Sequence, residues 1–149
     1  MIIFDLDGTI ALTDHRQHYL GETPKNWAEF HAACVADEPY KEVILVLNAL
    51  LQQGHTIEIW SGREATDRVL QDTKLWLTDS VRPDWEDCIK LRMRDVGKFL
   101  PDDRLKKAWI NEVTEGGDEI DFVFDDRDSM VSFWREMGIP CFQVAPGAF

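Results

Sequence analysis

The chain has 149 residues, a length typical of one domain, and its formal net charge is −12. This charge argues against a protein that coats duplex nucleic acid, although a local site can still bind a small anion. No apolar run approaches the length of a membrane span, and no basic start followed by an apolar stretch indicates a signal peptide. The three cysteines are widely spaced, so we expect reduced thiols and a cytoplasmic protein.

The first half of the chain alternates strand and helix around one irregular stretch. Residues 2–4 predict a short buried strand. Residues 12–40 are rich in His, Trp and Phe and show no clear strand. After them, residues 41–53 predict a helix, 55–60 a strand and 64–79 a second helix. We interpret residues 12–40 as a small cap, because loops that leave the carboxyl edge of a strand often carry specificity.

The second half continues the alternation without interruption. Residues 88–91 predict a short strand, and 102–113 predict a helix from apolar residues at helical spacing. Residues 120–124 are almost entirely apolar, which is typical of a strand covered on both faces. A helix over 128–137 and a last strand over 141–144 complete the pattern.

This alternation predicts an α/β fold over residues 1–149, taken as a single domain. Strands that alternate with helices form a parallel sheet with helices on both faces, a Rossmann-like arrangement. The expected cap, residues 12–40, is inserted after the first strand.

The segment Asp5-Leu6-Asp7-Gly8-Thr9 follows the first strand directly. Ligands of open α/β sheets bind at the carboxyl ends of the strands, so Asp5 and Asp7 can face one pocket. Two carboxylates aimed at one point repel each other, which implies a metal, a shared proton, or both. The alternative is an ordinary Asp-Gly turn on a surface loop.

Two further polar clusters follow later strands. Ser61-Gly62-Arg63 offers a hydroxyl and backbone N–H groups at an expected strand-to-helix turn, which suits an anion. The alternative is a serine that only caps a helix. Asp125 and Asp126 follow the apolar strand and repeat the carboxylate pattern, although an acidic helix start would look similar.

Lys106 and Lys107 fall in the first turns of the helix that opens at Pro101-Asp102-Asp103. Cations near a helix N-terminus oppose the helix dipole, so a lysine that reaches a phosphate would explain the placement. Adjacent residues point about 100° apart on a helix, so only one of the two can enter a pocket. The alternative is an ordinary solvated lysine.

Along the chain, the Asp5–Thr9 motif, Ser61-Gly62-Arg63, the helix with Lys106 and the pair Asp125-Asp126 follow in this order. This arrangement resembles the haloacid dehalogenase superfamily of phosphotransferases. A closer resemblance is to the 3′-phosphatase domain of phage polynucleotide kinase-phosphatase. It rests on these matching segments: the Asp5–Thr9 motif with Arg16, Ser61-Gly62-Arg63, Pro101 to Lys106, Asp125-Asp126-Arg127, Phe133-Trp134-Arg135 and the ending Gln143 to Phe149. That family ends in a Gly-Asp-Phe-like tripeptide where this chain has Gly147-Ala148-Phe149, and no GxxxxGK[ST] kinase motif occurs in the sequence.

The resemblance implies hydrolysis of a phosphomonoester through an aspartyl-phosphate. Asp5 would attack phosphorus, and Asp7 would protonate the leaving group and then deprotonate the hydrolytic water. Mg²⁺ would be held by Asp5, a backbone carbonyl of Asp7 and Asp125, with Asp126 close by.

The same resemblance implies a phosphate-binding set. Ser61, the N–H of Gly62 and Lys106 would hold the phosphoryl oxygens. Arg16 and Arg63 would reach the substrate or brace the loops that do. The alternative for Arg16 is a surface side chain paired with Asp14 or Glu22.

Three functions remain open from the sequence. The first is a phosphatase for the 3′ end of a nucleic acid, and the second is a phosphatase for small metabolites such as nucleoside monophosphates. The third is a non-catalytic receiver-like domain that binds Mg²⁺, which the presence of Asp7 and of the Ser61-Gly62-Arg63 turn disfavours. The expected partner is therefore a phosphorylated substrate and not a membrane.

Overall fold

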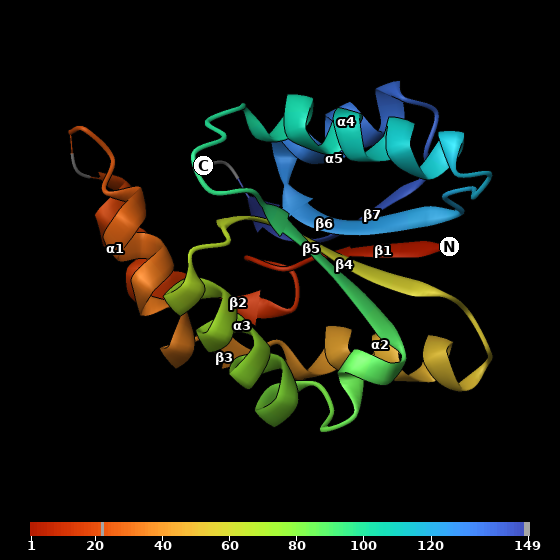
Figure 1. Cartoon of the computed structure of the whole chain (residues 1–149), viewed down its shortest axis with the longest axis horizontal. Helices are drawn as coiled ribbons and strands as arrows, with labels where there is room; N and C mark the ends of the chain where they lie inside the picture. Colours follow the sequence, from red (N-terminus) through yellow and green to blue (C-terminus); the bar gives the residue numbers. More distant parts are fainter. Residues whose placement is uncertain (22, 148–149) are drawn as a thin grey trace.

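The computed structural model describes residues 1–21 and 23–147 and is built around one parallel sheet (Figure 1). Its strands are β1 (Ile2–Asp5), β4 (Ile57–Glu64), β5 (Ile89–Arg94), β6 (Phe122–Arg127) and β7 (Cys141–Gly147). Their order across the sheet is β5-β4-β1-β6-β7. Strand β1 therefore lies at the centre, paired in parallel with β4 on one side and β6 on the other.

Four helices cover the two faces of the sheet, as Figure 1 shows. They are α2 (Lys41–Gln52), α3 (Asp67–Ser80), α4 (Asp102–Glu115) and α5 (Asp128–Glu136). Ile2 and Phe4 of β1 pack with side chains of α2 and α3, whereas Ile3 packs with those of α4 and α5. Alternate residues of the central strand thus enter two separate cores, because successive side chains of a strand point to opposite faces.

The predicted α/β fold is confirmed, and each predicted strand and helix is present with shifted ends. The largest shift concerns β4, which runs through Ser61, Gly62 and Arg63 to Glu64. Helix α3 begins after it at Asp67, and Thr66 is its N-cap, with its side chain accepting a hydrogen bond from the N–H of Val69. The expected strand-to-helix turn at Ser61 was therefore wrong, and so was the alternative that Ser61 caps a helix.

The segment between β1 and α2 has a compact structure of its own at the carboxyl edge of the sheet (Figure 1). Its elements are β2 (Ala11–Leu12), the 3₁₀ helix η1 (Asp14–Gly21), α1 (Trp27–Ala32), the 3₁₀ helix η2 (Ala33–Ala36) and β3 (Glu38–Pro39). The two short strands pair antiparallel and bring the ends of the segment together. No strand was expected here, because two-residue strands leave no alternation in a sequence. A third 3₁₀ helix, η3 (Trp85–Asp87), precedes β5.

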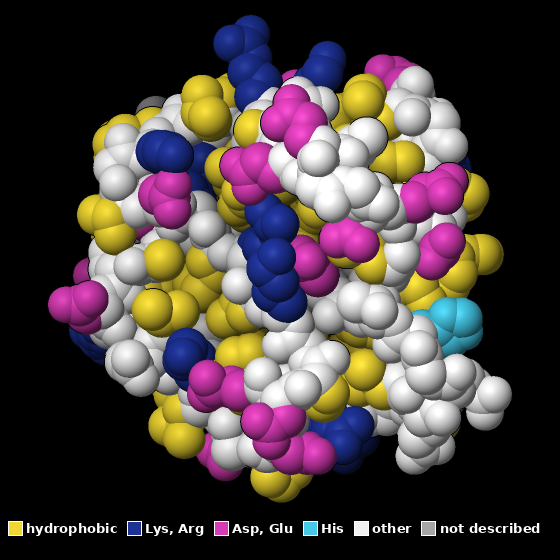
Figure 2. Space-filling view, turned by 45° about the vertical axis from the view of Figure 1, so that its right-hand side comes forward, with side chains coloured by type: hydrophobic (Ala, Val, Ile, Leu, Met, Phe, Trp, Pro, Cys, Tyr) yellow, Lys and Arg dark blue, Asp and Glu magenta, His cyan; other side chains and the backbone are white. Residues whose placement is uncertain are grey.

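The surface mixes charges of both signs, and Figure 2 shows Lys and Arg side chains interspersed with Asp and Glu. On the edge strand β5, Arg92 donates hydrogen bonds to Glu58 (2.8 Å) and Glu112 (2.7 Å). Charged side chains on an edge strand discourage pairing with another chain. Among the described residues, no helix is long and apolar enough to cross a membrane.

Candidate active site

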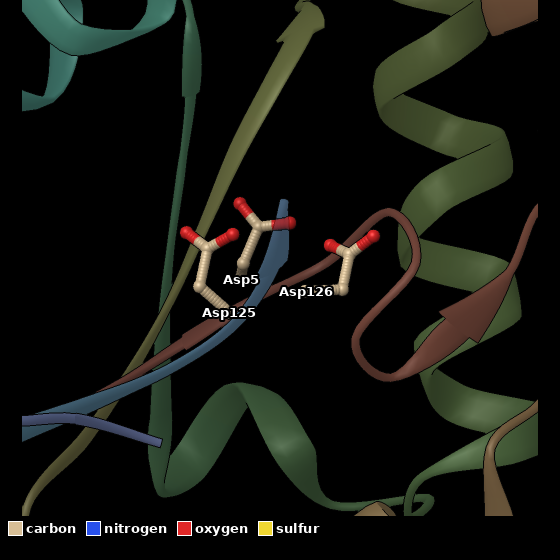
Figure 3. A group of neighbouring side chains, drawn as sticks. All are labelled: Asp5, Asp125 and Asp126. Carbon is tan, nitrogen blue, oxygen red and sulfur yellow. The ribbon is translucent and has the colours of Figure 1, made fainter. Parts of the chain in front are cut away.

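Three carboxylates converge at the carboxyl ends of the two neighbouring strands β1 and β6. One oxygen each of Asp5, Asp125 and Asp126 lies within 4.8 Å of the others, and Figure 3 shows the three side chains at the ends of these strands. Burial raises the pKa of Asp5 well above its usual value, and repulsion by Asp125 and Asp126 adds to the shift. Burial and repulsion by Asp125 also raise the pKa of Asp126 to about 6. Buried carboxylates that repel one another are stabilised in their ionised form by a nearby cation.

Lys106 supplies one positive charge to this cluster from helix α4. Its Nζ donates to Asp5 Oδ1 at 2.5 Å and to Asp125 Oδ2 at 3.0 Å, and Trp134 Nε1 also donates to Asp125 Oδ2 at 3.0 Å. Burial by itself would lower the pKa of Lys106, but Asp125 and Asp5 raise it well above the usual value. Lys107 is exposed, so only Lys106 of the adjacent pair enters the site.

Asp7 lies in a different environment, between two buried arginines. Arg63 Nη2 and Arg16 Nη2 donate to Asp7 Oδ1 at 2.5 and 2.6 Å. Burial alone would raise the pKa of Asp7, but Arg63 and Arg16 together hold it well below its usual range. Asp7 is therefore kept as a carboxylate, whereas Asp5 is pushed toward the protonated form.

Asp37 completes the arginine cluster, and no motif in the sequence predicts its part in the site. Arg16 donates to both of its carboxylate oxygens, at 2.7 and 2.6 Å, and Arg63 donates to Oδ2 at 2.8 Å. Asp37 lies at the end of η2, within the segment that carries no recognisable motif. Two carboxylates thus neutralise two buried guanidinium groups.

The expected contact of Arg16 and Arg63 with substrate is corrected by this geometry. Both side chains are completely buried, and neither is among the described residues that line the cavity at the site. They hold Asp7, whereas the alternative considered for them was to brace the loops that reach the substrate. The surface pairing of Arg16 with Asp14 is wrong, because Arg16 is buried and binds Asp7 and Asp37. The other partner considered, Glu22, lies outside the described residues, as do Ala148 and Phe149.

The Ser61-Gly62 stretch of β4 borders the carboxylate cluster at an irregularity of the sheet. The pairing of β4 with β5 shifts register between Ser61 and Glu64. A Cβ on Gly62 would lie 2.8 Å from Asp102 Oδ1, so a larger residue here would have to displace the carboxylate of Asp102. The hydroxyl of Ser61 is buried and accepts a hydrogen bond from the N–H of Arg63 at 3.1 Å. Gly62 lines the cavity together with Asp5 and Asp125, and the whole Ser61-Gly62-Arg63 segment lies within β4 and not at a helix start.

The sequence places Asp102 only at the start of the helix that carries Lys106, whereas in the structure it binds two arginines beside the cavity. It accepts hydrogen bonds from Arg94 Nη2 at 2.5 Å and Arg127 Nη1 at 2.6 Å. Burial alone would raise its pKa, but Arg127 and Lys106 lower it. Its place one helical turn before Lys106 is the sequence signal that could have identified it.

A cavity of about 600 Å³ opens above these groups. Asp5, Asp7, Lys106 and Asp125 line its floor, and side chains of α1 and of the loop after β5 line its walls. His31 of α1 is one of them, and burial lowers the pKa of its ring, which is therefore neutral. The site thus joins a charged floor to a largely apolar outer part.

The residues present fit a divalent cation. Mg²⁺ and similar hard cations prefer carboxylate oxygens, and a cation among Asp5, Asp125 and Asp126 would remove the repulsion that raises two of their pKa values. Lys106 and the backbone of Gly62 in β4, which line the same cavity, suit the oxygens of a phosphoryl group.

A parallel sheet with such a strand-end site defines a phosphatase of the haloacid dehalogenase class. Over residues 1–149 the chain matches the family described as the polynucleotide kinase PNKP phosphatase domain, and it belongs to that family. A protein of Autographa californica nuclear polyhedrosis virus, whose assigned name is bifunctional polynucleotide kinase/RNA ligase, is 29% identical over 142 residues. That alignment covers 93% of this chain and 18% of the viral protein.

Solved structures give the same assignment. Two chains from structures of a Pnkp1/Rnl/Hen1 complex, one titled an RNA repair complex, share 32% and 31% identity with TM-scores of 0.79 and 0.78. Both matches cover 99% of this chain, and they cover 43% and 46% of the relatives. A class C acid phosphatase from Bacillus anthracis with tungstate bound has a TM-score of 0.64 at 19% identity. The match covers 99% of this chain and 66% of the acid phosphatase, and at this identity it shows only that the fold is similar. The chain thus spans less than half the length of the relatives that share its family.

Proposed function

We propose that the protein is a Mg²⁺-dependent polynucleotide 3′-phosphatase that works through an aspartyl-phosphate on Asp5. One observation carries the chemistry: Asp5, Lys106 and Asp125 meet at the floor of a cavity. The family match over the whole chain supports the choice of a nucleic-acid 3′ end as the substrate.

In the first step, a carboxylate oxygen of Asp5 attacks phosphorus while the bond from phosphorus to the leaving oxygen breaks. The leaving alkoxide takes a proton from Asp7. Two arginines keep Asp7 ionised in the absence of substrate, so its pKa must rise before it can donate a proton. The negative charge of an incoming phosphate raises the pKa of a neighbouring carboxyl in this way. The arginines also hold the carboxyl of Asp7 in one position beside Asp5.

In the second step, water attacks the phosphorus of the aspartyl-phosphate, and Asp5 is released. Asp7 accepts the proton from that water. Because the pKa of Asp7 is low, its carboxylate is a weak base and must be closely aligned with the water to take the proton. The product phosphate then leaves through the cavity.

Lys106, the hydroxyl of Ser61 and the N–H of Gly62 stabilise the phosphoryl oxygens in both steps. Before substrate arrives, Lys106 is bound to Asp5 and Asp125, so its charge is already at the reaction centre. When bound by Asp5, Asp125, the backbone carbonyl of Asp7 and Asp126, Mg²⁺ supplies positive charge that offsets the carboxylates and the phosphate.

Residues 12–40 act as a small cap in this proposal. The segment supplies Arg16 and Asp37 to the buried cluster below the site and α1 to the wall of the cavity. The described residues of this segment leave the cavity open on one side, so a polymer end can enter.

The direct test is hydrolysis of a panel of phosphomonoesters with Mg²⁺ and with excess chelator. We expect a 3′-phosphorylated oligonucleotide to be the best substrate, ahead of the matching 5′-phosphorylated oligonucleotide and of nucleoside 3′- and 5′-monophosphates. Preference for a free mononucleotide would instead support a small-metabolite phosphatase. Full activity in excess chelator would contradict the metal-dependent mechanism, and no hydrolysis of any ester would leave a metal-binding domain.

A further inference from the structure

The loop that joins β5 to α4 carries unusually exposed apolar side chains. Phe99 is 86% exposed, and Val96 (62%) and Leu100 (42%) lie on the same loop. Single exposed apolar residues are normal on protein surfaces, but a group of them beside a cavity marks a ligand site. Phe99 and Leu100 both line the cavity above the carboxylate cluster.

This loop is held in place by Arg94. The guanidinium of Arg94 donates to the carbonyls of Lys98 (3.1 Å) and Leu100 within the loop. The same group donates to the carbonyl of Gly62 at 2.8 Å and to Asp102 at 2.5 Å. The loop that presents Phe99 is therefore tied through Arg94 to Gly62 of β4, one of the proposed phosphate-binding residues.

Helix α1 presents a second aromatic side chain to the same cavity. Trp27 is 43% exposed, lines the cavity and packs edge-on against Phe30, with ring centroids 5.8 Å apart. Phe30 lies under the guanidinium of Arg16 at 4.1 Å, and its carbonyl accepts a hydrogen bond from Arg16 at 2.9 Å. Arg16 also binds Asp7, so Trp27 too is positioned relative to the catalytic floor.

We propose that Trp27 and Phe99 form a stacking site for the base of the nucleotide that bears the phosphate. The inference rests on the proposed 3′-phosphatase function. With the phosphate on the cavity floor, the rest of the ester must extend into the outer part, where these two exposed aromatic side chains line the cavity. Aromatic side chains bind bases by stacking and tolerate any base, because every base has a π-face. Lys25, whose Nζ lies 5.8 Å from the Trp27 ring, adds a positive charge for the adjoining phosphodiester.

The test compares two 3′-phosphorylated oligonucleotides that differ only in the terminal base, which is present in one and replaced by an abasic sugar in the other. For Trp27→Ala and Phe99→Ala we expect KM for the substrate with the base to rise about tenfold or more, with little change in kcat. The abasic substrate should show no comparable rise in KM. Wild-type enzyme should itself bind the abasic substrate more weakly.

Two further variants separate stacking from other causes. Phe99→Trp should keep the low KM, because it keeps an aromatic ring. Phe99→Leu is apolar but has no ring, so its KM should rise. Leu75→Ala on α3, also at an exposed position (53%), is the matched control. Equal changes on both substrates, or full activity of Phe99→Leu, would overturn the stacking site. If wild-type enzyme does not hydrolyse the substrate with the base, the proposed function itself fails, and that result is visible before any variant is examined.

Discussion

Asp5 and Asp7 are two residues apart at the end of one strand, yet their surroundings shift their pKa values in opposite directions. Asp5 faces Asp125 and Asp126 with Lys106 between them, and burial with carboxylate repulsion raises its pKa. Asp7 faces Arg63 and Arg16, which lower its pKa despite burial. Three carboxylates share the one ammonium of Lys106 around Asp5, whereas the two arginines beside Asp7 are matched by two carboxylates, those of Asp7 and Asp37.

In the metal-free protein the two pKa shifts run opposite to the proposed roles, because the nucleophile Asp5 must be ionised and the acid Asp7 must carry a proton. A cation beside Asp5 would lower its pKa, and the negative charge of a bound phosphate would raise that of Asp7. In the proposed mechanism a cation from outside the chain would complete the half around Asp5, whereas the half around Asp7 already has its charged partners within the chain. The predictions below either break one half or measure the contrast between the two.

Asp5→Asn should have the largest effect on activity, a loss of about 10⁴-fold or more on any phosphomonoester, because the nucleophile is gone. The metal-free protein should unfold at an unchanged or higher temperature, since one of the repelling carboxylates has been removed. Steady-state kinetics and a thermal melt without metal measure the two effects. Near wild-type turnover would disprove the role of Asp5.

Asp7→Asn should reduce turnover by about 10²- to 10⁴-fold, the usual range for a lost acid–base group. Unlike Asp5→Asn, it should destabilise the fold by about 3 kcal/mol, because two buried guanidinium groups lose an anionic partner. The wild-type contribution of Asp7 is present above about pH 4, the unfolded-state value, and is lost as the pH falls, because its folded pKa is depressed.

Denaturant titrations of wild type and Asp7→Asn at pH 7 and at acidic pH measure this linkage. The gap in unfolding free energy between the two proteins should shrink toward low pH. A gap that is absent at pH 7, or that does not depend on pH, would show that the arginines do not stabilise Asp7.

Lys106→Ala should reduce kcat by about 10²- to 10³-fold through loss of a charge at the phosphoryl group. Lys107→Ala is the matched control one position away, and it should behave as wild type because its side chain is exposed. Equal, mild losses in the two variants would mean that neither lysine contacts the phosphate.

Arg16→Ala should lower kcat by about 10- to 100-fold, because Asp7 then shifts from its position beside Asp5. The loss should be similar on a 3′-phosphorylated oligonucleotide and on p-nitrophenyl phosphate, since Arg16 is buried behind Asp7 and lies away from the cavity wall. A loss confined to the oligonucleotide would restore a direct contact between Arg16 and the substrate.

The smallest effect concerns stability with metal. At a Mg²⁺ concentration 100 times its Kd, wild type should gain about 2.7 kcal/mol in unfolding free energy. Asp125→Asn should lose most of this gain, whereas Lys107→Ala should keep it. A gain of equal size in Asp125→Asn would place the metal elsewhere.

The sequence by itself determined the strands of the parallel sheet, the helices that cover its faces and the acidic strand ends, but not the elements between β1 and α2. These features depend on local patterns, such as the apolar run before Asp125 and the Asp-Gly that follows Leu6, and the period of a strand or helix is visible in any short window. The order of the motifs also fixed the family that residues 1–149 match. The ends of β4 were not predictable, because its extension through Arg63 depends on pairing with β5, far along the chain.

Only the tertiary structure decided the partners of the charged residues. Arg16 lies in a stretch without a motif, and its burial follows from the closing of β2 on β3, which brings Asp37 against it. Arg63 reaches Asp7 across 56 residues of sequence, and Asp102 meets Arg94 and Arg127 from separate elements. Ion pairs of this kind have no periodic signature, because the fold and not the spacing in the chain places the two charges side by side.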